Sequence, residues 1–371
     1  MNVTAVEPRI TEYLYQKASA AGVPLSGTFE LTPVCNMDCK MCYVRLSRQQ
    51  QESIGPLKTA QQWLDLGRRA KDAGMLYLLL TGGEPFSHPQ FQQIMEGLHR
   101  MGLLISINSN GTLIDENTVA WLKACPPVRM NISLYGVSDE TYGRLCGNPN
   151  GFTQTVRAIE LLQAAGIPVK LNCSLTPDNA PQLKEMIAFA NGKGLQIQVA
   201  GYMFPPARKA ESLAGENFRL TPEEAAWYTA YSEYLLLGKE RFLQRGCQCG
   251  PLTDPEEACA DTGDVMRCRA GRCSFWITWQ GNMTPCGMFP DGESCNVFEE
   301  DFETLWNRVK AQVEKIRLPA PCTNCSSKRV CRACAAMVLS ETGSFENVPR
   351  YRCRMTQAYP QQWERVKEEV Q

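Results

Sequence analysis

A repeat of short apolar runs, each followed by a segment of helix length, is the feature that most constrains the fold of this chain. The runs are rich in residues that favour strands and are bounded by turn residues. They occupy residues 29–31, 76–80, 103–108, 129–134, 169–175 and 196–200. Repeated strand–helix units predict parallel strand pairing with right-handed crossover connections.

Amphipathic patterns place helices between and around these runs. The helices are predicted at residues 10–21, 59–74, 89–101, 115–124, 151–165 and 180–194. Two helix starts carry capping signals, which are Thr59 with Gln62, and Thr221 followed by Pro222 and Glu224. These signals fix where the helices begin more firmly than the apolar pattern alone.

The pattern predicts an α/β fold, a partial (β/α)6 barrel of the TIM type, over residues 28–238. Residues 1–27 are interpreted as a lead-in, and residues 239–265 as a linker or lid. Residues 266–371 are predicted to form a small cysteine-rich domain. Such a barrel has its active site at the carboxyl ends of its strands.

Three cysteines lie in the loop after the first predicted strand. They are Cys35, Cys39 and Cys42, with the spacing C-x3-C-x2-C, and such a loop can turn three thiolates onto one soft metal centre. An electron-transfer [4Fe–4S] cluster ordinarily takes four cysteine ligands, so three would leave one iron open for a cofactor or substrate. A structural zinc knuckle or a group of buried thiols is the alternative.

The composition excludes several other classes of protein. The 18 cysteines follow no signal-peptide pattern, which favours reduced metal ligands over a disulfide framework and predicts a cytoplasmic location. His88 and His99 are the 2 histidines, so histidine metal sites and Ser-His-Asp hydrolysis are disfavoured. A net charge of −1 without a basic run disfavours nucleic acid and anionic membranes as partners, and no apolar stretch is long enough to span a membrane.

The sequence Thr81-Gly82-Gly83-Glu84-Pro85 directly follows the second predicted strand. With the three cysteines it resembles the radical S-adenosylmethionine (SAM) family, whose motifs are C-x3-C-x2-C and G-G-E-P. The resemblance implies a [4Fe–4S] cluster that binds SAM and cleaves it to methionine and a 5′-deoxyadenosyl radical, which abstracts hydrogen from a substrate. The glycines let the backbone approach a ligand, and Glu84 could accept a hydrogen bond from an ammonium group. A simple Gly-Gly turn is the alternative.

The resemblance also implies further SAM contacts at the strand ends. The implied cofactor-binding residues are Gly82, Gly83, Glu84, Pro85, Asn108, Ser133, Arg144, Asn172 and Met41. Arg144 would pair bidentately with the SAM carboxylate, and Asn172 would contact the ribose. For Ser133 and Arg144 the alternative is a strand-facing serine and a solvated arginine. Met41 stands where the family often has an aromatic residue, but it can still lie against adenine.

The last third of the chain holds a second, denser group of cysteines. Their patterns are Cys268-x4-Cys273-x7-Gly281-x4-Cys286, then Cys322-x2-Cys325-x5-Cys331-x2-Cys334, and finally Cys353. A hairpin over residues 277–283 is predicted to bring Cys273 and Cys286 together. A pair of zinc ribbons is one interpretation, because C-x2-C pairs also suit zinc.

Behind a radical SAM barrel, the same pattern resembles the SPASM extension, which carries two auxiliary [4Fe–4S] clusters. The resemblance implies that auxiliary cluster I is held by Cys268, Cys273, Cys286 and Cys334, and auxiliary cluster II by Cys322, Cys325, Cys331 and Cys353. The last spacing is x2 where x3 is common, so the role of Cys334 is open. The implied cofactors are therefore SAM and three [4Fe–4S] clusters.

The remaining cysteines have no implied ligand role. Cys125, Cys146 and Cys173 are expected to be small buried residues. Cys247, Cys249, Cys259 and Cys295 lie in predicted loops and have no assigned role.

SPASM enzymes mostly modify peptides or proteins, so the leading prediction is oxidative modification of a peptide or protein side chain, such as a thioether or C–C crosslink. The expected partners include an electron donor such as flavodoxin or ferredoxin. Only 34 residues precede Cys35, which is short for the leader-binding domain of many peptide maturases, so either a separate peptide-recognition protein delivers the substrate or the substrate binds the barrel directly. The alternatives are radical oxidation of a small molecule, including heme side-chain decarboxylation, and a non-catalytic iron–sulfur or zinc scaffold.

Formylglycine formation in sulfatases is disfavoured. Anaerobic sulfatase maturases place an aspartate base directly after the cysteine that corresponds to Cys286, and this chain has Gly287 there. Tyr135, Tyr202 and Asp291 are candidates for an acid or base by position alone, with a structural role as the alternative for each.

Overall fold

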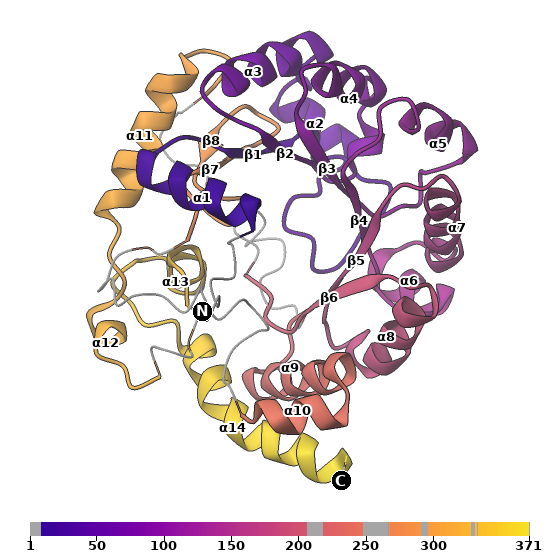
Figure 1. Cartoon of the computed structure of the whole chain (residues 1–371), viewed down its shortest axis with the longest axis vertical. Helices are drawn as coiled ribbons and strands as arrows, with labels where there is room; N and C mark the ends of the chain where they lie inside the picture. The colour runs from indigo at the N-terminus through magenta and orange to yellow at the C-terminus, as the bar shows by residue number, and fades with distance from the viewer. Residues whose placement is uncertain are drawn as a thin grey trace, which may run out of the picture.

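A computed structural model describes residues 9–205, 218–247, 266, 268–290, 296–327, 331 and 333–370. Its centre is one curved sheet with the strand order β6-β5-β4-β3-β2-β1-β7-β8 (Figure 1). The strands are β1 Ser26–Glu30, β2 Tyr77–Thr81, β3 Leu104–Ser109, β4 Arg129–Ser133, β5 Val169–Ser174, β6 Gln196–Ala200, β7 Ser274–Ile277 and β8 Met283–Thr284. All neighbours pair in parallel except β7 and β8, which form an antiparallel hairpin.

Most helices of the barrel form where they were predicted, and two, over residues 48–54 and 139–146, were not predicted. The barrel helices are α1 Ile10–Ala21, α2 Arg48–Ile54, α3 Ala60–Asp72, α4 Phe91–Arg100, α5 Glu116–Leu122, α6 Asp139–Cys146, α7 Gly151–Ala164, α8 Leu183–Gly192 and α9 Pro222–Leu237. Both predicted capping boxes are present, because Thr59 and Thr221 each accept a hydrogen bond from the backbone of the residue three positions on. The partial (β/α)6 barrel is confirmed.

The sheet separates an apolar face from a polar one. Ile105 and Ile107 of β3 are buried in the main core, and the alternating positions Ser106 and Asn108 are only partly buried. Figure 1 shows α3, α4, α5, α7 and α8 outside the arc of strands, with the violet loop after β1 on its concave side. The apolar positions therefore face the helices, and the concave face is left to polar side chains.

The C-terminal region continues the same sheet. Strand β7 pairs in parallel with β1, so Ser274 lies beside Ser26 and Ile277 beside Phe29. The predicted hairpin is confirmed, since β8 runs back antiparallel to β7. Residues 266–371 as a domain of their own remain a prediction, as do the other predicted boundaries.

The remaining helices belong to this C-terminal part and its approach. They are α10 Lys239–Arg245, α11 Phe302–Lys315, α12 Ala320–Thr323, α13 Ala335–Thr342 and α14 Arg350–Val370. Helix α14 lies along α9 (Figure 1), and the Tyr359 hydroxyl donates to Glu233 at 2.8 Å between them. In the described part of the chain, no helix has the length and apolarity needed to cross a membrane.

Candidate cofactor site

The loop after β1 is fixed by a close backbone contact with the loop after β2. The Gly83 amide donates to the Thr32 carbonyl at 2.6 Å, and the Glu84 amide donates to the Val34 carbonyl at 3.0 Å. A Cβ atom on Gly83 would lie 2.6 Å from both the Pro33 and Val34 carbonyl oxygens. Glycine is therefore required there, and the neighbour that excludes a side chain is the backbone leading into Cys35.

Glu84 joins the loop after β2 to the end of β3. Its carboxylate is fully buried and accepts hydrogen bonds from Ser109 Oγ at 2.8 Å and from the Asn110 amide at 2.7 Å. Burial raises the pKa of Glu84 to about 7, and these hydrogen bonds oppose the rise. In this structure the carboxylate binds protein groups, and its predicted contact with the SAM ammonium remains a prediction.

Asn110 carries this network to the first cysteine. Its Nδ2 lies 3.6 Å from Cys35 Sγ and donates to Asn36 Oδ1 at 3.0 Å. The Asn36 side chain donates in turn to Thr112 Oγ1 at 2.7 Å. Asn110 was not among the predicted site residues. Its position in Asn108-Ser109-Asn110-Gly111-Thr112, directly after β3, was the available signal.

The C-terminus of α6 holds the other side of the loop. The Asp38 amide donates to the Cys146 carbonyl at 2.8 Å, and the Lys40 amide donates to the Leu145 carbonyl at 3.1 Å. These are carbonyls of the last turn, which have no partner inside the helix. The loop thus supplies part of the C-terminal cap of α6. Cys146 itself is fully buried, as predicted.

The three thiols lie close enough together to influence one another. Burial raises the pKa of Cys35 to about 12, with Glu84 as the next cause and Cys39 and Cys42 adding smaller effects. Three thiols on one loop fit a [4Fe–4S] cluster that keeps an open iron, and cluster binding would replace their protons. In the part of the chain that the structure describes, no three Cys, His, Asp or Glu side chains converge on a single metal ion.

The concave face presents unpartnered acceptors where SAM is expected. Asn131 Nδ2 donates to Asn108 Oδ1 at 2.8 Å, and Asn172 lies beside Ser133 in the strand register. Within the described residues, Asn172 Oδ1 and Asn131 Oδ1 are buried and lack a hydrogen-bond partner. A buried acceptor of this kind fits a ligand hydroxyl, such as the ribose hydroxyl predicted for Asn172. Asn131 was not predicted.

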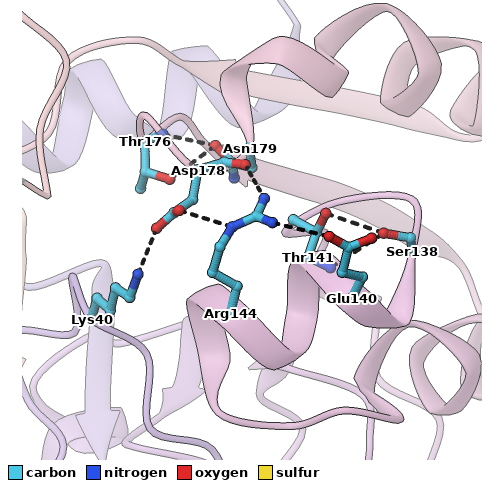
Figure 2. Close-up of polar contacts among 8 residues, drawn as sticks. All are labelled: Lys40, Ser138, Glu140, Thr141, Arg144, Thr176, Asp178 and Asn179. Carbon is cyan, nitrogen blue, oxygen red and sulfur yellow. Dashed lines mark hydrogen bonds and ion pairs between the residues drawn. The ribbon is translucent and has the colours of Figure 1, made fainter.

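Arg144 and Met41 occupy different surroundings. Arg144 Nε lies 3.0 Å from Asp178 Oδ1, and Arg144 Nη2 donates to the Asp178 carbonyl at 3.0 Å (Figure 2). Met41 packs at the edge of a small apolar cluster that includes Met37 and Tyr142. The predicted SAM contacts of both residues remain predictions.

The candidate acids and bases have structural partners where they are described. Tyr135 packs with Tyr142 beside the cysteine loop, and burial holds its pKa well above the ordinary value. The Tyr202 hydroxyl donates to Glu341 Oε1 at 2.7 Å. Asp291 lies outside the described residues, as do Cys249, Cys259 and Cys295.

The structure brings some cysteines of each implied C-terminal set near one another. Burial raises the pKa of Cys286 to about 12, and the neighbouring thiols of Cys334 and Cys268 add to the rise. Cys334 therefore lies with the first set despite its shortened spacing. In the second set, burial raises the pKa of Cys322, and the neighbouring thiols of Cys353, Cys331 and Cys325 add to the rise. Ligation by either set remains a prediction.

Comparison with known proteins identifies the barrel. The radical SAM superfamily model matches residues 29–190. The chain is 25% identical over 340 residues to the AdoMet-dependent heme synthase of Methanosarcina barkeri, covering 85% of this chain and 93% of that protein. It is 28% identical over 341 residues to the mycofactocin maturase MftC of Mycobacterium ulcerans, with 89% and 87% covered. The Bacillus subtilis subtilosin biosynthesis protein AlbA is 26% identical over 287 residues, with 77% and 60% covered.

Solved structures share the fold over nearly the whole chain. The crystal structure of Streptococcus suis SuiB bound to the precursor peptide SuiA has a TM-score of 0.69 at 18% identity, covering 95% of this chain and 83% of that one. Native anSMEcpe with AdoMet and a peptide has a TM-score of 0.70 at 18% identity, with 94% and 99% covered. At this identity the likeness establishes the fold, which includes the C-terminal region.

Proposed function

We propose that this chain, whose residues 29–190 match the radical SAM superfamily model, is a radical SAM enzyme that oxidatively modifies a side chain of a peptide or protein. The family implies a [4Fe–4S] cluster and SAM as cofactors. When bound, they supply a 5′-deoxyadenosyl radical that abstracts hydrogen from the substrate. The observation that carries the proposal is the meeting of the cysteine loop, the glycine pair and Glu84 above a polar concave face.

The chain's own residues would hold and orient these cofactors. Cys35, Cys39 and Cys42 would bind the cluster. The Glu84 amide holds the Val34 carbonyl next to Cys35, and the Asn110 side chain lies against the Cys35 thiol. The Asn172 amide oxygen, which is buried and has no hydrogen-bond partner among the described residues, would accept a hydrogen bond from SAM. Each of these roles is one of positioning, which is what a protein contributes to cofactor chemistry.

A peptide substrate is supported by the relatives. MftC and AlbA are a maturase and a bacteriocin biosynthesis protein, and the SuiB structure contains a precursor peptide. A thioether or C–C crosslink would leave the peptide with two fewer hydrogens. We propose that the two C-terminal cysteine sets bind auxiliary [4Fe–4S] clusters, which makes three clusters in all. One of the two hydrogens would leave as an atom to 5′-deoxyadenosine and the other as a proton, and such clusters would supply an acceptor for the one electron that remains.

A small-molecule substrate is the second candidate. It is favoured by the relatives named AdoMet-dependent heme synthase, one of which matches over 85% of this chain. In that case a propionate side chain of a porphyrin would lose CO2 and a hydrogen. The polar side chains of the concave face are compatible with either substrate.

Formylglycine formation is disfavoured by packing as well as by sequence. A Cβ atom at Gly287 would lie 2.8 Å from the indole ring of Trp276. An aspartate could not be placed there without moving this ring, which belongs to β7 inside the sheet. The residue that follows Cys286 is therefore glycine for a structural reason.

The proposal also includes partners and a compartment. The cluster needs a low-potential electron donor such as flavodoxin or ferredoxin, and a separate protein could deliver the peptide. Clusters held by many thiolates require a reducing environment, so we place the enzyme in the cytoplasm.

The substrate class can be tested directly. The anaerobically prepared enzyme, with SAM and dithionite, is incubated with a library of synthetic peptides or with a porphyrin that carries propionates. Loss of two hydrogens from a peptide, matched by equal 5′-deoxyadenosine, supports the proposal. Loss of CO2 from the porphyrin, with no change in any peptide, would replace it with the second candidate.

A further inference from the structure

Asp178 lies at the centre of an ion-pair network that reaches the cysteine loop. Lys40 Nζ lies 3.0 Å from Asp178 Oδ2, and Arg144 Nε lies 3.0 Å from Asp178 Oδ1 (Figure 2). Arg144 Nη2 also donates to the Asp178 carbonyl at 3.0 Å. One residue from the loop after β5 thus binds the cysteine loop and α6 together.

The guanidinium of Arg144 is already engaged along one edge. Its Nε and Nη2 atoms, which form the fork that binds a carboxylate bidentately, are both directed at Asp178. Nη1 lies 3.5 Å from Glu140, one turn earlier in α6. A ligand carboxylate could use this fork only by displacing Asp178.

Asp178 is itself held by a rigid turn. The fully buried Asn179 accepts a hydrogen bond from the Thr176 amide at 2.7 Å and donates to the Ser174 carbonyl at 3.1 Å. The Asp178 side chain is 25% exposed, less than either of its cationic partners. The turn therefore presents the carboxylate as a fixed anchor.

Lys40 connects the Asp178 carboxylate to the loop that carries Cys39 and Cys42. Lys40 follows Cys39 directly and precedes Cys42 by two residues, and its amide donates to the Leu145 carbonyl. Arg144 precedes Leu145 in α6. The side chains of Lys40 and Arg144 thus converge on Asp178 at the place where the loop backbone meets the helix end.

We propose that Asp178 is a positioning residue for the loop that carries Cys39 and Cys42, and that Arg144 serves this anchor instead of binding a ligand carboxylate. The inference rests on the proposed binding of a [4Fe–4S] cluster by this loop. Loss of the anchor loosens the loop, and the cluster then loses iron faster.

The test uses the anaerobic holoenzyme with Asp178→Asn, Arg144→Gln and the double variant. The matched control is Arg157→Gln, which breaks the Arg157–Glu116 pair on the outer surface, where both side chains are more than half exposed. Two quantities are measured in each protein. The first is the rate at which a chelator abolishes the EPR signal of the reduced cluster, which is identified as the signal that changes when SAM is added. The second is the SAM dissociation constant.

Asp178→Asn and Arg144→Gln should each speed the loss of this signal about two- to fivefold, as expected for one surface ion pair. The double variant should lose the signal no faster than the faster of the two single variants, because both residues belong to one anchor. Arg144→Gln should keep the SAM dissociation constant within about threefold, and Arg157→Gln should change neither quantity.

A different pattern would overturn the inference. If Arg144→Gln weakened SAM binding about tenfold or more while Asp178→Asn changed neither quantity, Arg144 would be a ligand of the SAM carboxylate. A wild-type enzyme with no SAM-sensitive signal would instead remove the proposed function itself. The two failures are therefore distinguishable.

Discussion

The indole Nε1 of Trp276 donates a hydrogen bond to Glu30 Oε2 at 3.1 Å, between neighbouring strands β7 and β1. Glu30 is 1% exposed, so its carboxylate depends on protein donors. The contact joins the cysteine-rich C-terminal region to the strand that leads into Cys35. The two parts of the chain are therefore joined by a side-chain hydrogen bond as well as by one sheet.

Replacing Trp276 with Phe removes this donor from a buried carboxylate. The expected cost is about 1–3 kcal/mol of unfolding free energy, because the acceptor stays buried. Urea unfolding of the anaerobic holoprotein, followed by far-UV circular dichroism, measures it.

Trp227→Phe is the matched control for Trp276→Phe. Trp227 Nε1 is buried and has no hydrogen-bond partner in the part of the chain that the structure describes, so its loss should cost less than the loss of Trp276 Nε1. Equal costs for the two substitutions would show that ring packing, not the bond to Glu30, decides the effect.

Replacing Gly83 with Ala should displace the cysteine loop. The new Cβ atom would lie 2.6 Å from the Pro33 and Val34 carbonyl oxygens, which are backbone atoms that cannot rotate away. We expect loss of most of the SAM-sensitive EPR signal, with the auxiliary cysteine sets unaffected. The control is Gly55→Ala, since Gly55 has extended φ of 160° and open space around it. Retention of the full signal in Gly83→Ala would contradict the account.

Tyr202→Phe separates a structural role from a catalytic one. Burial and the Glu341 carboxylate hold the pKa of Tyr202 well above its ordinary value, so the phenol stays protonated and donates to Glu341. Arg219 also pairs with Glu341 at 2.6 Å and remains in the variant. We expect a loss of about 1 kcal/mol in unfolding free energy with 5′-deoxyadenosine and product formation retained. Normal stability with product formation abolished would make Tyr202 a catalytic residue.

His88 should make the protein less stable in mild acid. Its Nδ1 accepts a hydrogen bond from the Gln90 amide and its Nε2 lies 3.1 Å from the Lys58 carbonyl, so the neutral ring fits with its proton on Nε2. Burial lowers the pKa of His88 below 6.5, and the Lys58 carbonyl opposes this. The unfolded chain therefore binds more protons below pH 6.5, and this contribution to stability is lost as the pH falls. The difference in unfolding free energy between pH 7.5 and pH 5.5 should be smaller in His88→Gln than in the wild type, and an equal difference would refute this assignment.

The strands and most barrel helices could be predicted because local pattern and burial agree in a parallel sheet. Residues 196–200 were predicted as a strand and form β6 unchanged. Helix α6 was missed, although Ser138 caps its start and Gly147 ends it in a left-handed conformation, because only the tertiary contact with the cysteine loop shows its importance.

The site was predictable where the chemistry is local and not where it depends on folding. The cysteine loop and the glycine pair carry their spacing in the sequence. Asn110 and Asp178 join segments far apart in the chain, so no local spacing reveals them. The meeting of β7 with β1 is likewise a long-range pairing.

The most direct test counts iron and 5′-deoxyadenosine in the anaerobic protein and in a variant with Cys35, Cys39 and Cys42 all changed to Ala. At four irons per cluster, the account predicts about twelve irons in the wild type and about eight in the variant. It also predicts that SAM cleavage is confined to the wild type. Unchanged iron in the variant, or 5′-deoxyadenosine formed without these cysteines, would contradict the central claim that this loop binds the cluster that cleaves SAM.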